Sequence, residues 1–287
     1  MIDTLIYDVG AHLGADTEFY LKKGFSVVAI EAAPQLCDYL FEKFAECVRS
    51  GQLKILNLAI ADEPGAVDFY MDQEKLDWGT TQLAWVARNK SLGGGEITKI
   101  RVAACLLSDI MKEHGVPRYC KIDIEGNDLS ALKSLRQIEA VPHFISIESE
   151  KTSWEKLMEE FAVFNELGYR RFKIMDQMLV NLQRCPDPAL EGGSCEHAFE
   201  VGNSSGLFGE ELPGRWLDSF EALEQYKNIF RGYALNGHNG LFSTKRDLFY
   251  LLGRIQAKIA HLRGSTTYIH PAFNLPPDGW YDTHAAL

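Results

Sequence analysis

The chain has 287 residues, 46% of them hydrophobic and 24% charged, which is enough for one large α/β domain or for one domain with a substantial appendage. Its 29 basic and 40 acidic residues give a formal net charge of −11, which opposes the binding of bare nucleic acid and favours a small-molecule substrate. The sequence shows neither a signal-peptide pattern nor an apolar run that could span a membrane, so we expect a cytoplasmic protein.

The N-terminal stretch predicts a strand, a tight turn, a helix and a second strand. Residues 5–9 are an apolar run of strand formers, residues 10–14 have a glycine at each end, and a second apolar run, 26–30, ends in Glu31. A glycine-bounded turn lets a ligand approach backbone N–H groups, and an acidic residue at the tip of the neighbouring strand can accept hydrogen bonds from both ribose hydroxyls. The pattern therefore favours a nucleoside site over a turn whose glycines serve only packing.

The turn also bears on which nucleoside would bind. The dinucleotide fingerprint G-x-G-x-x-G places its second glycine against the pyrophosphate, and His12 stands at that position. We therefore expect a ligand without pyrophosphate. The run Asp-Val-Gly-Ala-x-x-Gly at 8–14 looks like the first motif of class I S-adenosylmethionine methyltransferases, which favours S-adenosylmethionine over NAD.

The next segments extend the sheet. A helical stripe at 34–49 precedes a third apolar run at 53–60, and strand and helix units in this order imply parallel strands joined by right-handed crossovers. We expect the adenine ring to lie near the end of that third strand, against residues 59–62. Shorter strands are predicted at 66–70 and 97–103.

A long loop, residues 71–96, separates the two shorter strands. Loops of this length inside a compact domain are usually functional or mobile. The loop contains Gly79, Thr80 and Thr81, and we interpret it as a lid whose threonines face the site, with a surface insertion as the alternative.

Acidic residues follow two later strands. The run Lys-Ile-Asp-Ile-Glu-Gly carries Asp123 and Glu125 at a strand end, and a strand at 144–147 delivers Glu148 and Glu150. The carboxyl ends of parallel strands meet at the edge where open α/β sheets bind ligands. We expect Asp123 and Glu125 to be functional and Glu150 to be structural, because carboxylates at strand ends commonly cap helices or pair with lysines. Glu148 stays open between these two roles.

The rest of the chain predicts the last strands and a C-terminal extension. A hairpin of strands 169–175 and 178–182, turning at Asp176-Gln177, completes about seven strands. The helices expected besides those already named are 106–114, 154–167, 216–230 and 244–262, and an extended tail follows Arg263. We therefore divide the chain into an S-adenosylmethionine-binding domain, 1–183, and an extension, 184–287, which covers the acceptor site or forms an oligomer contact. A homodimer is left open.

The six cysteines are scattered and contain no C-x-x-C pair. Cys185 and Cys195 flank a loop rich in proline and glycine and could form a bridge or hold a metal. A cytoplasmic location favours a reduced pair.

With these stretches placed, the sequence resembles the FkbM family of S-adenosylmethionine-dependent methyltransferases over about residues 4–175. The matching parts are the run Asp-Val-Gly-Ala-His-Leu-Gly-Ala-Asp-Thr at 8–17, Glu31 with Pro34, Gly79-Thr80-Thr81 and Lys-Ile-Asp-Ile-Glu-Gly at 121–126. The resemblance implies an α/β fold, a class I methyltransferase Rossmann-like three-layer sandwich whose mostly parallel seven-stranded sheet has one antiparallel strand, plus a helical C-terminal extension. It also implies methyl transfer to a hydroxyl oxygen of a sugar or natural product.

The chain departs from the family pattern at three places. His12 replaces the usual asparagine, Ala32 replaces a proline, and Asn127-Asp128 stand where a small residue and glutamate are usual. These changes keep polar capacity, so we expect cofactor binding to survive, while the acceptor stays open.

The expected chemistry is in-line displacement at the sulfonium methyl, with the acceptor oxygen held in attack geometry. An alcohol also needs a base, and the catalytic candidates are Glu125 and Glu148, with His238 behind them. The residues expected to bind the cofactor are Asp8, Gly10, His12, Gly14, Thr17, Glu31, Ala59, Asp62 and Asp123. Within this set Asp123 is assigned to the methionyl end and Asp8 to support of the glycine turn. The carboxylates could instead hold Mg²⁺, although no spacing requires a metal.

Three alternatives stay in view. A nitrogen acceptor is disfavoured because the fourth strand lacks the Asn/Asp-Pro-Pro-aromatic run of several amino-directed relatives. A non-catalytic scaffold that keeps the methyltransferase fold is disfavoured because Glu31 and the strand-end carboxylates are both present. An oxidoreductase is disfavoured by the missing second glycine.

Overall fold

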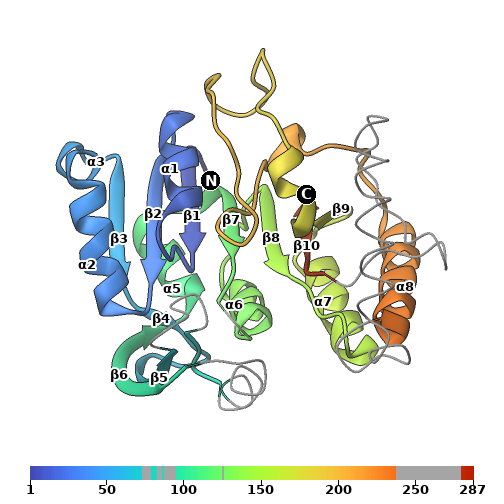
Figure 1. Cartoon of the computed structure of the whole chain (residues 1–287), viewed down its shortest axis with the longest axis horizontal. Coiled ribbons are helices and arrows are strands. Elements are labelled where there is room, and N and C mark those ends of the chain that lie inside the picture. Colours follow the sequence, from blue (N-terminus) through green and yellow to red (C-terminus); the bar gives the residue numbers. More distant parts are fainter. Residues whose placement is uncertain (73–78, 83–85, 87–94, 125, 237–278) are drawn as a thin grey trace.

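The computed structural model describes residues 1–72, 79–82, 86, 95–124, 126–236 and 279–287. Its main feature is a seven-stranded sheet. The strands lie in the spatial order β3 (Leu53–Asn57), β2 (Ser26–Glu31), β1 (Ile2–Val9), β7 (Pro117–Ile122), β8 (Phe144–Glu148), β10 (Tyr281–Ala286) and β9 (Arg171–Asp176), as Figure 1 shows. β10 is antiparallel to both neighbours, and the pairs from β3 to β8 are parallel. The predicted mostly parallel sheet with one antiparallel strand is therefore confirmed.

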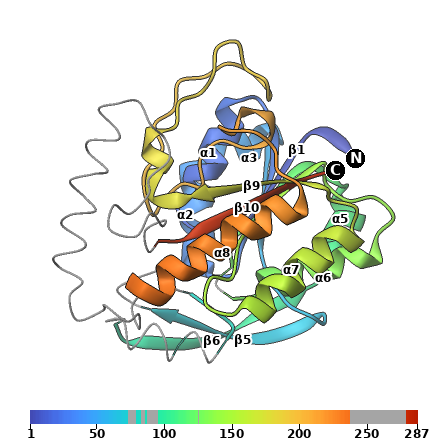
Figure 2. The same ribbon diagram turned by 90° about the vertical axis from the view of Figure 1, so that its right-hand side faces the viewer.

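Helices cover both faces of this sheet because successive strand residues point in opposite directions. In β1, Leu5, Tyr7 and Val9 belong to one hydrophobic core, and Ile6 belongs to the other. The first core packs against α5 (Leu107–His114), α6 (Asp128–Ser134), α7 (Trp154–Glu166) and α8 (Ser219–Asn236). The second packs against α1 (Ala15–Lys22), α2 (Pro34–Lys43) and the segment 180–212. Figure 2 shows α5, α6 and α7 together on one side of the sheet.

The remaining elements are short. They are α3 (Ala45–Ser50) and the 3₁₀ helices η2 (Leu135–Gln137), η3 (Gln177–Leu182) and η4 (Gly209–Glu211). Within the described ranges, no helix is both long enough and apolar enough to cross a membrane.

A second sheet of three strands lies below the first in Figure 1. It consists of β4 (Ala59–Ile60), β6 (Ile97–Cys105) and β5 (Gly65–Asp72), and it confirms the two shorter strands that the sequence predicted. The single strand expected at 53–60 is divided between the two sheets. The division falls after Asn57, whose side-chain amide donates a hydrogen bond to the carbonyl oxygen of Glu31, 2.9 Å away.

The predicted hairpin of 169–175 with 178–182 is wrong. The Asp176 carboxylate accepts a hydrogen bond from the N–H of Met178 (2.9 Å), and the chain turns there into the 3₁₀ helix η3. The partner of β9 is instead β10, whose six residues are all buried between β9 and β8. A short apolar run fits a buried strand and a buried turn of helix equally well, so its sequence could not separate them.

The last strand affects the proposed division of the chain. The boundary after residue 183 stays a prediction, but residues 281–286 of the extension lie inside the main sheet. The predicted helix at 216–230 is observed as α8, and the predicted helix at 244–262 lies outside the described residues.

Candidate active site

A cavity of about 560 Å³ lies at the carboxyl edge of the main sheet. Its wall comes from the turn after β1, the ends of β2, β7 and β8, the start of β10, the small sheet and residues 202–205. This is the edge where open α/β sheets bind ligands, because the connections separate there. The position agrees with the edge predicted from the strand-end carboxylates.

The two glycines of the first turn have different roles. Gly10 has φ +85°, and a Cβ there would lie 1.9 Å from the backbone oxygen of Asp123, so only glycine lets the turn approach β7 this closely. Gly10 lines the cavity. Gly14 has φ +74°, and a Cβ there would lie 2.6 Å from the Phe44 ring, so its lack of a side chain serves packing against α2. His12, next to the cavity, also has a positive φ of 48°.

Glu31 is held at the cavity wall by backbone donors. Its side chain ends β2, and Oε2 accepts from the N–H of His12 while Oε1 accepts from the N–H of Ala33, both at 2.9 Å. Burial raises the pKa of Glu31, and these two backbone hydrogen bonds oppose the rise. A carboxylate has about four acceptor positions, so capacity is left for the hydroxyls of a ribose.

Lys121 lies at the centre of a buried charge cluster. Its Nζ is 3.1 Å from Asp16 Oδ2, 3.6 Å from Asp8 Oδ1 and 3.6 Å from Asp123 Oδ2. Burial acts to lower the pKa of Lys121, but these three carboxylates outweigh it and hold the pKa well above its ordinary value. Thr17 Oγ1 donates to Asp8 Oδ2 (2.6 Å), and burial still raises the pKa of Asp8 to about 6.

Sequence reasoning missed two members of this cluster. It named Asp8, Thr17 and Asp123 but treated Lys121 only as a pairing partner, and it did not name Asp16 as a site residue. Asp16 belongs to the quoted motif at 8–17 and Lys121 to that at 121–126, so their presence in these motifs was the available signal.

Three carboxylates form a row along the edge of the sheet. Asp123 follows β7, Glu148 ends β8, and Asp282 lies opposite Glu148 in β10. Glu148 Oε1 is 2.8 Å from Lys151 Nζ. Nothing in the sequence marked Asp282, because its strand had not been predicted. Behind the row, burial together with Asp123 and Glu148 raises the pKa of Asp128 to about 8.

The other predicted site residues lie at different distances from the cavity. Ala59 and Asp123 line it, and Asp62 lies in the turn after β4 away from the lining. Glu125 and His238 lie outside the described residues. Glu150 accepts backbone N–H groups at the start of α7, in agreement with the structural role expected for it.

Part of the predicted lid meets the cavity. Thr81 lines it, and its Oγ1 accepts a hydrogen bond from Asn127 Nδ2 at 2.7 Å. Thr80 is buried, and its backbone pairs with that of Tyr70. Residues 73–78, 83–85 and 87–94 of this loop lie outside the described ranges.

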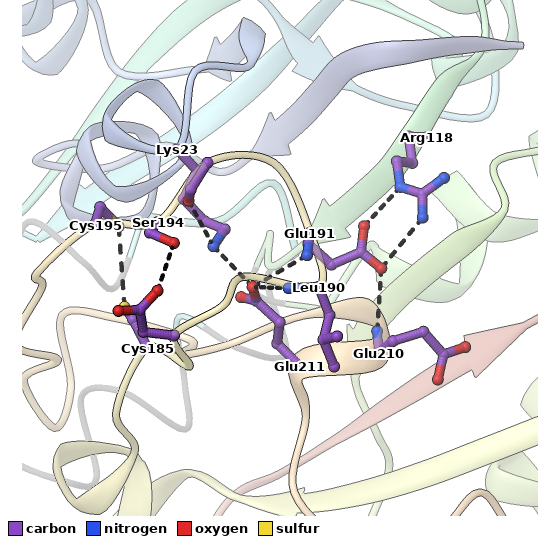
Figure 3. Close-up of polar contacts among 11 residues, drawn as sticks. Lys23, Arg118, Cys185, Leu190, Glu191, Ser194, Cys195, Glu210 and Glu211 are labelled. Atoms are coloured by element: carbon purple, nitrogen blue, oxygen red, sulfur yellow. Dashed lines mark hydrogen bonds and ion pairs between the residues drawn. The ribbon is translucent and has the colours of Figure 1, made fainter.

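The segment 183–212 is attached to the end of α1 by a buried ion pair and to β7 by a half-buried one (Figure 3). Lys23 Nζ is 2.9 Å from Glu211 Oε1, and Arg118 Nε is 2.6 Å from Glu191 Oε2. Between Glu191 and Glu211 in the chain, the N–H of Ser205 donates to Asp16 Oδ1 at 2.9 Å. These contacts hold residues 202–205 against the cavity, beside the Lys121 cluster.

Figure 3 also shows Cys185 beside Cys195. Their Sγ atoms are 4.0 Å apart, and both are free thiols. No group of three or more histidine, cysteine, aspartate or glutamate side chains in the described part of the chain is arranged to hold a metal ion.

Comparison with known proteins identifies the family. A family model described as the methyltransferase FkbM domain matches residues 8–171, which is more than half of the chain. The comparison with curated proteins found no match. Solved structures show weaker likenesses. A methyltransferase FkbM from Methylobacillus flagellatus KT is 17% identical with a TM-score of 0.39, and the match covers 60% of this chain and 39% of that chain.

Two other solved structures are a precorrin-6y C5,15-methyltransferase from Geobacter metallireducens GS-15 and a SAM dependent methyltransferase from Aquifex aeolicus. The first is 10% identical with a TM-score of 0.34 and coverages of 61% of this chain and 67% of that chain. The second is 12% identical with a TM-score of 0.28 and coverages of 60% and 76%. The family assignment rests on the domain match over residues 8–171. The chain therefore belongs to the FkbM family of S-adenosylmethionine-dependent methyltransferases.

Proposed function

We propose that this protein transfers the methyl group of S-adenosylmethionine to a hydroxyl oxygen of a small molecule such as a sugar or a natural product. The observation that supports this most is that one cavity is lined both by the glycine turn with Glu31 and by the carboxylate of Glu148. A subsite suited to a nucleoside and a group able to accept a proton thus share one space.

The cofactor end of the cavity is formed by the ends of β2 and β7 together with β4 of the small sheet. We assign the ribose to Glu31, the adenine to the surroundings of Ala59 and the methionyl end to Asp123, all of which line the cavity. When bound, S-adenosylmethionine supplies an electrophilic methyl group on a sulfonium. Asp8 and Thr17 support the site indirectly. Thr17 donates a hydrogen bond to Asp8, and Asp8 pairs with Lys121, which forms part of the cavity wall.

The acceptor end needs a base, because an alcohol loses its proton as its oxygen is methylated. We assign this role to Glu148. It lines the cavity, and its Oε1 lies 2.8 Å from Lys151 Nζ. Glu125 and His238 stay candidates on the sequence alone.

Replacing Glu31 with alanine tests the cofactor assignment. We expect the variant to bind S-adenosylhomocysteine about 10- to 100-fold more weakly, because hydrogen bonds to the ribose worth on the order of 1–3 kcal/mol are lost. Calorimetric titration gives both dissociation constants, and Glu113→Ala, on the exposed surface of α5, is the control. Because Glu31 also anchors two backbone N–H groups, a thermal melt must show that the variant is folded. Absence of binding to the wild type would refute the cofactor itself.

The acceptor class is tested by product chemistry. Purified protein is incubated with isotopically labelled S-adenosylmethionine and a panel of methyl glycosides and cyclic alcohols, each matched by the corresponding amine. We expect labelled methyl ethers from hydroxyl compounds and no N-methyl products. Products from the amines alone would overturn the hydroxyl assignment, and binding of S-adenosylhomocysteine with no product in either series would favour the scaffold alternative.

A further inference from the structure

Asp282 faces the cavity at its acceptor end, and among the described residues its carboxyl group has no hydrogen-bond or ion-pair partner. This residue of β10 is 7% exposed and lines the cavity. It lies opposite Glu148 in the pairing of β10 with β8. Burying a polar group without a hydrogen bond costs free energy, so a group in this state at a cavity wall indicates a ligand that supplies the missing bonds.

Gln177, next to the same strand, is a second buried polar side chain without a hydrogen-bond partner in the described part of the chain. It follows β9, is 3% exposed and lines the cavity, and neither its Oε1 nor its Nε2 has a hydrogen-bond partner in the described part of the chain. Its backbone N–H donates to the carbonyl oxygen of Trp280 at 3.1 Å, while Asp282 lies opposite Met175. Gln177 and Asp282 thus line the same cavity where β9 and β10, which Figure 2 shows side by side, meet it.

Aromatic and ion-paired side chains line the cavity as well. Trp280 and Tyr233, the latter from α8, line the cavity. Lys151 Nζ bonds Glu148 and lies 5.8 Å from the centre of the Tyr233 ring. The charges of Lys151 and Glu148 thus compensate each other, and what this end offers a ligand is hydrogen bonding beside ring faces.

We propose that Asp282 and Gln177 form the acceptor-recognition subsite, and that this subsite takes an uncharged ligand with at least two neighbouring hydroxyl groups. A hydroxyl both donates and accepts, so two adjacent hydroxyls can satisfy the carboxyl of Asp282 and the amide of Gln177 together. The C–H face of such a ring can pack on Trp280 or Tyr233. This inference deepens the proposed methyl transfer and rests on it for the identification of the ligand as the acceptor.

The surroundings of Asp282 favour its protonated form. Burial, reinforced by Asp123 and Glu148 and to a smaller extent by Asp16, holds the pKa of Asp282 well above its usual range, against the opposing effect of Lys121. A protonated carboxyl donates one hydrogen bond and accepts another, and an asparagine side chain can do the same. A carboxylate that bound a cation could not be replaced by asparagine without loss. The same substitution therefore separates an uncharged ligand from a cationic one.

The experiment measures ligand binding apart from catalysis. Wild-type protein saturated with S-adenosylhomocysteine is titrated, by saturation-transfer NMR, with methyl α-D-glucopyranoside, its 2-amino-2-deoxy counterpart and cyclohexanol. The variants are Asp282→Leu, Asp282→Asn and Gln177→Leu, and the matched control is Asp176→Asn, a neighbouring acid that does not line the cavity. Affinity for S-adenosylhomocysteine is measured for every variant as the test of an intact site.

We expect the wild type to bind the neutral glycoside more tightly than cyclohexanol. Asp282→Leu and Gln177→Leu should each weaken glycoside binding about tenfold, and Asp282→Asn and Asp176→Asn by less than about threefold, with S-adenosylhomocysteine binding unchanged throughout. With any acceptor found by product chemistry, the loss should appear in KM more than in kcat, which a purely structural defect would not produce.

The inference fails if Asp282→Leu binds the glycoside as the wild type does, or if the wild type binds no glycoside. It also fails if the amino sugar is preferred and Asp282→Asn loses it, because that result identifies a cation site. Glycoside binding without methyl transfer to any acceptor would remove the proposed function and keep the subsite. Methyl transfer that is insensitive to Asp282→Leu would keep the proposed function and remove the subsite.

Discussion

Lys121→Met is expected to destabilise the folded protein by about 3–5 kcal/mol, because removal of one partner from a buried ion cluster leaves uncompensated charge behind. Methionine keeps most of the volume of lysine, so packing changes little. What is lost is the ammonium group that lies 3.1–3.6 Å from the carboxylates of Asp8, Asp16 and Asp123. Urea unfolding followed by circular dichroism measures the difference directly.

The loss of stability in this variant should depend on pH. The pKa of Asp8 is raised to about 6 even beside Lys121, and without the lysine the carboxylate of Asp8 must take up a proton for the folded state to keep it buried. The folded variant then binds more protons than its unfolded chain, so its free energy of unfolding increases as the pH falls from about 7 towards about 5. The control is Lys133→Met, which breaks only the exposed ion pair with Glu159 and should leave stability near that of the wild type. Wild-type stability of Lys121→Met at neutral pH would contradict the central position of this lysine.

Glu148→Gln is expected to lower kcat by about 10²- to 10⁴-fold, which is the usual contribution of a positioned general base. Glutamine has nearly the same shape and can still accept a hydrogen bond from Lys151 Nζ, so S-adenosylhomocysteine binding should change little. Single-turnover methyl transfer to a hydroxyl acceptor, measured over a range of pH, gives the effect on the chemical step.

The matched control for this experiment is Glu150→Gln. Glu150 is close to Glu148 in the chain and similarly buried, but it accepts backbone N–H groups at the start of α7 and does not line the cavity. Its kcat should stay within a few-fold of the wild type. If Glu148→Gln kept wild-type kcat at every pH, the base would have to be sought elsewhere, first at Glu125 and His238.

Much of the fold could be predicted from the sequence because its signals are local. The apolar runs 5–9 and 26–30 became β1 and β2, and the antiparallel pair β5 and β6 appeared where two short strands were expected. Gly10 and Glu31 could be picked out for the same reason, since a turn that needs glycine and a carboxylate at a strand tip are both legible within a few residues. The family match over residues 8–171 covers this same part of the chain.

Most of the omissions depend on contacts between distant parts of the chain. The sequence by itself located the strands β1, β2, β3, β7 and β8, the glycine turn and the acidic residues at the strand ends. Only the tertiary structure decided that β10 inserts between β8 and β9, that Lys121 joins Asp8 and Asp16, and that Asp282 stands opposite Glu148. The physical reason is that periodicity and turn chemistry report the conformation of a few neighbouring residues. Which buried strand fills a gap in a sheet, and which charges share one cavity, is decided by packing and electrostatics summed over the whole fold.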